Sequence, residues 1–163
     1  MPQIYLLAGG NIDNTSDKFK KLFLYLSERI GTIEFVSHYY TSTAWGYVSE
    51  HAFVNVALIV NTTLTPEAAL CQCLKIEQLM GRLPHEKNQY ADRTMDIDII
   101  FYDDMVINTP HLQVPHPRMH IRNFVLTPLA EICPEKIHPI LNQTVSALKK
   151  DCPDKAVVQQ IDL

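Results

Sequence analysis

Residues 53–61, FVNVALIVN, form the most strand-like stretch of the sequence, and the rest of the fold can be built outward from them. By the two-residue repeat of a strand, Phe53 and Asn55 point to one face, while the apolar residues between and after them point to the other. An amide among apolar neighbours is costly to bury unless it is hydrogen-bonded. Asn55 therefore either bonds to nearby backbone or reads the edge of a heterocycle.

Three further strands are predicted around this stretch. Residues 4–8 form a short buried strand closed by Gly9 and Gly10, and residues 32–40 and 95–102 are rich in β-branched and aromatic side chains. Residues 41–52 read as a polar loop.

Two helices are predicted between the strands. The first follows turn and capping residues at 11–15, carries apolar residues at helical spacing and ends where Gly31 would adopt a left-handed cap. Thr65 as N-cap, Pro66 at the first helical position and Gly81 beyond the end bracket the second helix. Glu77 falls within the apolar stripe of that helix.

The order of elements predicts the fold class. Strand, helix, strand, strand, helix, strand fits a ferredoxin-like α+β sandwich with a mostly antiparallel sheet, both helices on one face and a loop-lined cleft on the other. From residue 110 onward seven prolines leave room only for short pieces, with one helix near residues 144–150. We expect a single domain over residues 1–163.

Composition excludes several classes of function. Fourteen basic and eighteen acidic residues give a net charge of −4, which disfavours nucleic-acid and membrane partners. The sequence contains no long apolar run, and its four cysteines form no CxxC pair. The seven histidines are scattered without a zinc-ligand spacing. We therefore expect a cytoplasmic protein without a zinc centre.

The segment RTMDIDII, residues 93–100, is the sharpest chemical feature. On a strand Asp96 and Asp98 project side by side, with Cα atoms roughly 6.6 to 7 Å apart, while the apolar residues between them face the other way. Two such carboxylates can hold a pair of Mg²⁺ ions, which commonly arrive with phosphates. The alternative is that both aspartates occupy the solvated side of an amphipathic strand.

Basic side chains from separate segments complete a possible phosphate site. Arg82, Arg93 and the pair Arg118 and Arg122 lie in three different segments and can converge on a polyphosphate, although an ordinary surface position is the commoner fate of any single arginine. His116 lies between two prolines that restrict its backbone. The sequence has neither a P-loop nor a GxGxxG motif, so any ATP must be held by metal ions and side chains.

Six stretches in the same order and spacing resemble the 6-hydroxymethyl-7,8-dihydropterin pyrophosphokinase family over roughly residues 4–141. They are AGGN (8–11), YTSTAWG (40–46), FVNVAL (53–58), IEQLMGR (76–82), RTMDIDIIFYDD (93–104) and VPHPRMHIRNFVLTPL (114–129). The resemblance implies transfer of the β,γ-diphosphate of ATP to the hydroxymethyl oxygen of the pterin, with release of AMP, in tetrahydrofolate biosynthesis.

The resemblance also implies the site. It places two Mg²⁺ ions on Asp96 and Asp98 and gives catalytic roles to these two aspartates and to Arg82 and Arg93. ATP would be bound by Arg82, Arg93, His116 and Arg122, and the pterin by Ser42, Thr43, Trp45, Phe53, Asn55 and Phe124. Glu77, Lys87 and Tyr90 are further candidates, the last as an aromatic lid. We expect ATP and the pterin as the partners of a monomer.

The sequence also departs from the family pattern. Gly10 and Ser42 stand where the family usually has serine and threonine, and Ala44 replaces a common proline. In the segment 83–92, Pro84 replaces a frequent arginine and Tyr90 a tryptophan, so closure of this loop cannot be carried over from the family.

Two other functions remain open at this point. Ferredoxin-like sandwiches also serve as RNA-binding or small-molecule regulatory modules, and a nucleotidyltransferase can use a DxD pair with Mg²⁺. Release of AMP would identify the pyrophosphokinase, release of pyrophosphate the transferase, and no turnover the binding module.

Overall fold

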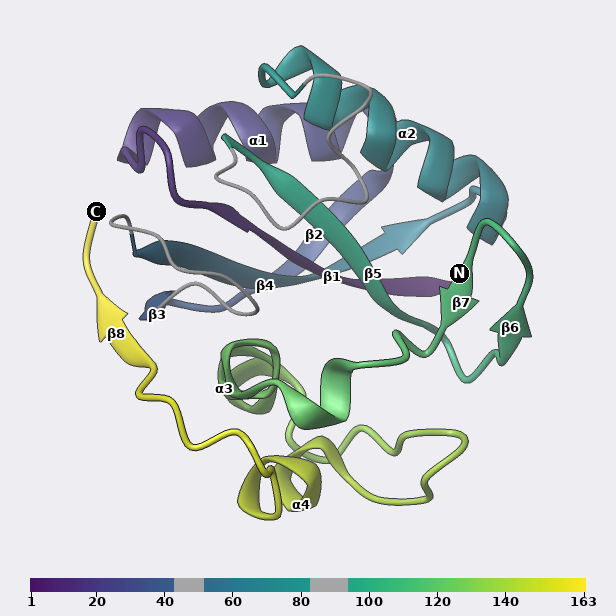
Figure 1. Cartoon of the computed structure of the whole chain (residues 1–163). Coiled ribbons are helices and arrows are strands. Elements are labelled where there is room, and N and C mark those ends of the chain that lie inside the picture. Colours follow the sequence, from purple (N-terminus) through teal and green to yellow (C-terminus); the bar gives the residue numbers. More distant parts are fainter. Residues whose placement is uncertain (43–51, 83–93) are drawn as a thin grey trace.

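The protein is built on a six-stranded antiparallel sheet, seen in a computed structural model that describes residues 1–42, 52–82 and 94–163 (Figure 1). The strand order is β5-β1-β4-β3-β8, and β2 also pairs with β4. The strands are β1 (Gln3–Gly10), β2 (Gly31–Val36), β3 (Tyr39–Ser42), β4 (Phe53–Thr62), β5 (Asp96–Tyr102) and β8 (Gln159–Ile161). β4, the strand predicted at residues 53–61, is central, and β5 is an edge strand.

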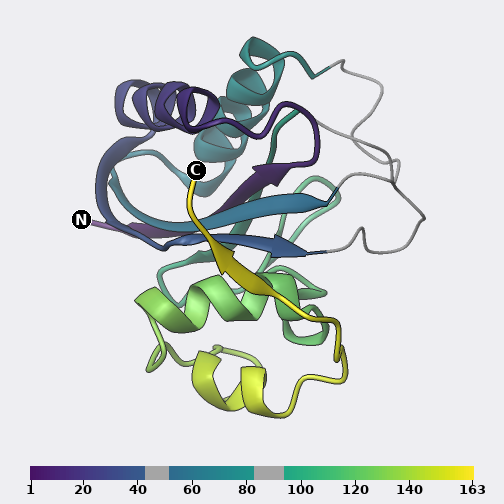
Figure 2. The same cartoon turned by 90° about the vertical axis from the view of Figure 1, so that its left-hand side faces the viewer.

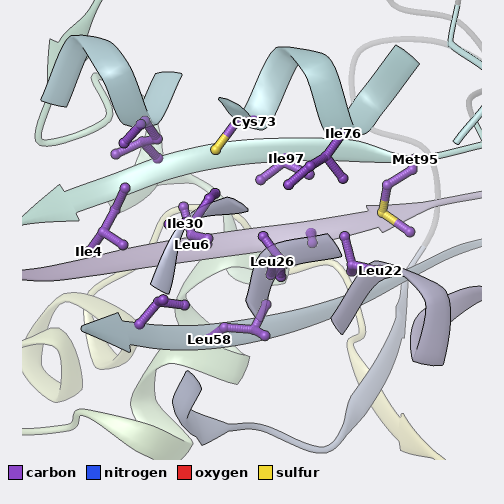
Figure 3. Packing of buried hydrophobic residues seen from close by; sticks show 14 of the residues in the cluster. Ile4, Leu6, Leu22, Leu26, Ile30, Leu58, Cys73, Ile76, Met95 and Ile97 are labelled. Carbon is purple, nitrogen blue, oxygen red and sulfur yellow. The ribbon is translucent and has the colours of Figure 1, made fainter. Parts of the chain in front are cut away.

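Helices α1 (Ser16–Arg29) and α2 (Pro66–Leu79) cover one face of the sheet (Figure 2). Both predicted N-caps are confirmed, because the Thr15 and Thr65 hydroxyls accept from the backbone N–H three residues on. Gly81 has φ +104°, as expected beyond a helix end. Alternate residues of the strands pack against these helices, including the fully buried Leu6 and Leu58 (Figure 3).

The other face is not left open, which corrects the expectation of helices on one face only. α3 (Asn123–Ile132) and α4 (Val145–Lys150) lie against it (Figure 2). α4 was predicted, but α3 was not, because Pro128 lies inside it. The proline removes one helical hydrogen bond, and the complete burial of Leu126 and Leu129 against the sheet offsets that loss.

Two details near the strands also differ from expectation. Gly31 is not a left-handed cap but the first residue of β2, where a Cβ atom would lie 1.9 Å from the Asn61 carbonyl oxygen. The predicted strand 32–40 is split into β2 and β3, because Ser37 exchanges backbone and side-chain hydrogen bonds with Ala57 at the break. Close backbone approach and a serine hydroxyl therefore replace regular pairing at these positions.

The region after β5 holds more structure than the prolines indicate. The chain turns at Asp103, which has φ 45°, and then forms the hairpin β6 (Ile107–Asn108) and β7 (Gln113–Val114) and the short helix η2 (Met119–Ile121). All four cysteines are free thiols. Within the described ranges, every helix is too short or too polar to cross a bilayer.

Candidate active site

Residues from three neighbouring strands line up in one row of the sheet, with a carboxylate and an amide on either side of a glycine. In the strand register Asp96 of β5 is paired with Gly9 of β1, and Gly9 is paired with Asn55 of β4. The residues that flank this row in the chain, such as Val54 and Ile97, belong to the core under α1 and α2. By strand alternation the row therefore faces the side of the sheet that α3 covers.

Gly9 is the residue that allows Asn55 its place in the row. A Cβ atom on Gly9 would lie 2.3 Å from Asn55 Oδ1 and 2.2 Å from the Val54 carbonyl oxygen. Asn55 is buried, so its amide sits against bare backbone rather than against a side chain. Sequence reasoning missed Gly9, and only its position at the end of a strand pointed to it.

Arg82, just beyond α2, links this row to that helix. Its Nη1 donates to Glu77 Oε2 at 2.7 Å and to Asp96 Oδ1 at 2.6 Å. Glu77 Oε2 also accepts from the backbone N–H of Ile97, on the edge strand β5. The side chains of Arg82 and Glu77 are 3% and 1% exposed, whereas that of Asp96 is 38% exposed. A buried ion pair thus holds a carboxylate that still reaches solvent.

Asp98 opens onto a pocket of about 420 Å³ at the outer edge of β5. Leu70 of α2, His116 and the β6–β7 hairpin residues 109–113 are among its other lining residues, as are Ile97, Ile99 and Pro117. Ile97 and Ile99, on either side of Asp98, belong to the core, so Asp96 and Asp98 share the opposite face as predicted.

His116 stands on the wall of this pocket as a neutral imidazole. Burial, together with the nearby charges of Arg122 and Arg118, lowers its pKa from 6.5 to about 4, although Asp96 acts in the opposite direction. Its Nδ1 accepts from the backbone N–H of Arg118 at 3.1 Å. Nε2 therefore carries the proton of the neutral ring and is the atom available to donate.

The start of α3 brings two more predicted residues together. The guanidinium of the buried Arg122 lies 5.7 Å from the centre of the Phe124 ring, a cation–π contact. On the sheet, Ser42 of β3 is paired with Phe53 of β4, directly beside the Asn55 position. Ser42 is buried, and its hydroxyl has no hydrogen-bond partner among the described residues.

Several predicted site residues lie outside the described ranges. They are Thr43, Trp45, Lys87, Tyr90 and Arg93. The sequence departures at Ala44 and Pro84 lie there too.

The donor set agrees with a hard divalent cation. The described residues contain no group of three histidine, cysteine or acidic side chains that could enclose a metal ion. Two carboxylates on one strand face, of which Asp98 lines the pocket, instead fit Mg²⁺, which proteins usually hold through one or two carboxylates together with substrate phosphates. Asp96 and Asp98 therefore suit a metal that arrives with a nucleotide.

Comparison with known proteins identifies the family. Residues 5–134 match the model of the 7,8-dihydro-6-hydroxymethylpterin-pyrophosphokinase (HPPK) family. A 2-amino-4-hydroxy-6-hydroxymethyldihydropteridine pyrophosphokinase of Aquifex aeolicus is 36% identical over 151 residues, covering 93% of this chain and 92% of that protein. The folic acid synthesis protein FOL1 of Dictyostelium discoideum is 36% identical over 162 residues, and this chain spans 97% of its own length but 24% of that protein.

A solved structure confirms the fold class. The crystal structure of Plasmodium falciparum HPPK-DHPS, wild type with pterin and p-hydroxybenzoate, superposes with a TM-score of 0.73 at 18% identity, over 91% of this chain and 42% of that one. The fold is thus ferredoxin-like, as the order of elements predicted. On the family match and on the identity with the Aquifex protein, the chain belongs to the 6-hydroxymethyl-7,8-dihydropterin pyrophosphokinase family.

Proposed function

We propose that the row of Asp96, Gly9 and Asn55, with the pocket beside Asp98, is where this chain carries out the reaction of its family. The chain is an ATP-dependent pyrophosphokinase of folate biosynthesis. Such an enzyme passes the β,γ-diphosphate of ATP to the hydroxymethyl group of 6-hydroxymethyl-7,8-dihydropterin and releases AMP. The observation that carries the assignment is the register that sets a carboxylate and a buried amide on one sheet face, two strands apart.

The spacing of this row suits two substrates that must meet. Neighbouring strands lie about 4.8 Å apart, so the backbones of Asp96 and Asn55 are roughly 10 Å apart. A phosphate group held near Asp96 and a pterin held near Asn55 would then face each other across the bare backbone of Gly9. Holding two reactants in line in this way supplies much of the rate enhancement in phosphoryl transfer.

The nucleotide is assigned to the pocket beside Asp98. The pocket is large enough for a nucleoside, with Leu70 and the β6–β7 hairpin as its walls. His116 Nε2 would donate a hydrogen bond to the phosphate chain, and the charge of Arg122 would offset charge that develops during transfer. Arg82 is buried on Asp96 and Glu77, so its first task is to hold Asp96 in place.

The pterin is assigned to the other end of the row. Asn55 offers both a donor and an acceptor to the edge of the heterocycle, which matches the amide-like edge of a pterin. Phe53 and Phe124 supply aromatic faces for stacking, and the Ser42 hydroxyl lies beside Phe53 in the sheet.

Mg²⁺ is assigned to Asp96 and Asp98. When bound with ATP, the ions would neutralise phosphate charge and polarise the transferred group. The chain's own contribution is to hold both carboxylates on one face, with Asp96 fixed through Arg82 and Glu77. The hydroxymethyl oxygen then forms a bond to the β-phosphorus and gives up its proton to solvent, the bond from that phosphorus to the α,β-bridging oxygen breaks, and AMP leaves.

We also propose that the chain acts as a monomer in the cytoplasm. Its four free thiols suit a reducing compartment.

Identification of the products tests the proposal. The protein is incubated with MgATP and 6-hydroxymethyl-7,8-dihydropterin, and the phosphorus-containing products are followed by ³¹P NMR. We expect AMP and the pterin diphosphate in equal amounts. Free pyrophosphate with a nucleotidylated product would instead indicate a transferase, and an unchanged spectrum a binding module.

A further inference from the structure

We infer that Asp154 is a positioning residue for the substrate site, acting through the start of α3. The inference rests on the proposed function, since it concerns the residues that bind the two substrates there. Asp154 lies in the segment that follows α4, residues 151–161, which we call the C-terminal strap. The strap is beyond residues 5–134, the part that the family model matches.

The strap holds the first residue of α3 with two hydrogen bonds. Asp154 Oδ2 accepts from the backbone N–H of Asn123 at 3.0 Å, and the side-chain amide of Asn123 donates to the Ala156 carbonyl oxygen at 2.9 Å. Asp154 Oδ1 accepts from the backbone N–H of Ala156 at 3.0 Å, which fixes the carboxylate itself. Residue 122, the helix N-cap position, makes no side-chain capping bond, so Asp154 supplies the cap from outside the helix.

The capped position separates two proposed site residues. Arg122 precedes Asn123 and Phe124 follows it, and the two side chains are in cation–π contact. A shift of the first turn of α3 therefore moves the phosphate-side arginine and the pterin-side ring together. A carboxylate at a helix N-terminus also interacts favourably with the helix dipole, which strengthens this attachment.

The far end of the strap is attached to the opposite wall of the site. β8 pairs with β3 in the register Thr41 to Gln159 and Tyr40 to Gln160 (Figure 1). Thr41 precedes Ser42, and Tyr40 is paired with Asn55 on the strand's other side. The strap thus connects the β3 wall of the proposed pterin site to the α3 wall, and Asp154 is its attachment at α3.

The test compares Asp154→Ala with Asp154→Asn and with a matched cap variant. Thr144 is the N-cap residue of α4, where its hydroxyl accepts from the Ala147 N–H, but α4 carries no proposed site residue. For each full-length variant the melting temperature is measured first. The pterin dissociation constant, KM for ATP and kcat are then measured well below it. Phe124→Ala is measured beside them.

We expect Asp154→Ala to weaken pterin binding roughly threefold to tenfold, in line with the loss of a helix cap. Asp154→Asn keeps an oxygen acceptor for the Asn123 N–H but loses the acceptor for the Ala156 N–H, so it should recover part of the lost pterin affinity. Thr144→Ala should lower the melting temperature comparably and leave the pterin dissociation constant unchanged.

Unchanged pterin binding in Asp154→Ala would overturn the inference, as would equal weakening in Thr144→Ala or no recovery in Asp154→Asn. Phe124→Ala separates this outcome from the proposed site. If it leaves pterin binding unchanged while Asp154→Ala weakens it, the pterin assignment of Phe124 fails and the positioning role of Asp154 stands. If Phe124→Ala weakens binding and Asp154→Ala does not, the site stands and the inference fails.

Discussion

The two ends of one sheet face differ in chemistry although they share the same strands. On the side that α3 covers, one end of the sheet carries the apolar residues Tyr5 and Leu7 of β1 and Ile59 of β4. The other end carries Gly9 of β1 and Asn55 of β4. The apolar end packs against α3 and α4, whereas the polar end forms the proposed site. The change comes at the same level on neighbouring strands, so the sheet itself aligns the polar groups.

The comparison shows how the fold compensates the free-energy cost of burying polar groups at its site. At the apolar end, burial stabilises the fold by about 25 cal/mol for each Å² of apolar surface removed from water. At the polar end a buried arginine, glutamate and amide would be destabilising if they were isolated. Arg82 and Glu77 are stabilised because Arg82 is bonded to two carboxylates and Glu77 also accepts from the backbone N–H of Ile97 on β5.

The largest expected effect tests the polar end alone. Asp98→Ala should lower kcat by about a thousandfold or more, because a metal-binding carboxylate supplies several kcal/mol of charge stabilisation in the transition state. Pterin binding should change less than twofold. Asp17→Ala, at an exposed carboxylate on α1, is the control and should leave both quantities unchanged. Near-normal turnover in Asp98→Ala would show that the polar end does not have the catalytic role assigned to it.

The second prediction tests the apolar end alone. Leu126→Ala empties a fully buried position of α3 and should lower the free energy of unfolding by about 2 to 4 kcal/mol, measured by urea denaturation. At a temperature where the variant is folded, its kcat should stay close to that of the parent. A large fall in kcat with little loss of stability would mean that the two ends are not separable.

The third prediction divides the polar end into its two halves. Asn55→Ala should weaken pterin binding about tenfold or more, because the heterocycle loses its hydrogen-bonding partner in a buried site, while KM for ATP changes little. Calorimetric titration with the pterin and with a non-hydrolysable MgATP analogue measures both. An unaltered pterin dissociation constant would take Asn55 out of the pocket.

The last prediction concerns His116 and pH. Its pKa is about 4 in the folded protein and about 6.5 in the unfolded chain, so the unfolded chain binds more protons between these values. The free energy of unfolding should therefore fall as the pH falls from 6.5 to 4, by up to about 3 kcal/mol from this group.

Denaturation curves at several pH values check this prediction. His116→Gln should remove that part of the slope and leave the part that comes from His138, whose pKa is also lowered by burial. An identical slope in the two proteins would show that His116 takes up its proton at the ordinary pH in the folded state.

Much of the fold followed from local sequence signals. The caps at Thr15 and Thr65, the strand around Asn55 and the alternation at Asp96 and Asp98 depend on residues close together in the chain, and all are found as predicted. α3 was missed because local propensity penalises Pro128, whereas burial against the sheet outweighs that penalty.

The site was less accessible from the sequence. The sequence named candidate residues, but their arrangement in a row depends on pairing between distant strands, which a single sequence does not specify. The role of Gly9 depends on the same pairing, because its need for a bare backbone arises only opposite Asn55. The link from Arg82 to Asp96 depends on how α2 docks at the edge of β5.

The most direct test measures whether metal and pterin meet at the polar end. With Mn²⁺ in place of Mg²⁺ and a non-hydrolysable ATP analogue, paramagnetic relaxation of the bound pterin's hydroxymethyl protons is recorded by NMR. The account predicts strong, nucleotide-dependent broadening of these protons in the parent protein and its loss in Asp98→Ala. Equal broadening in both proteins, or none in the parent with both ligands bound, would contradict it.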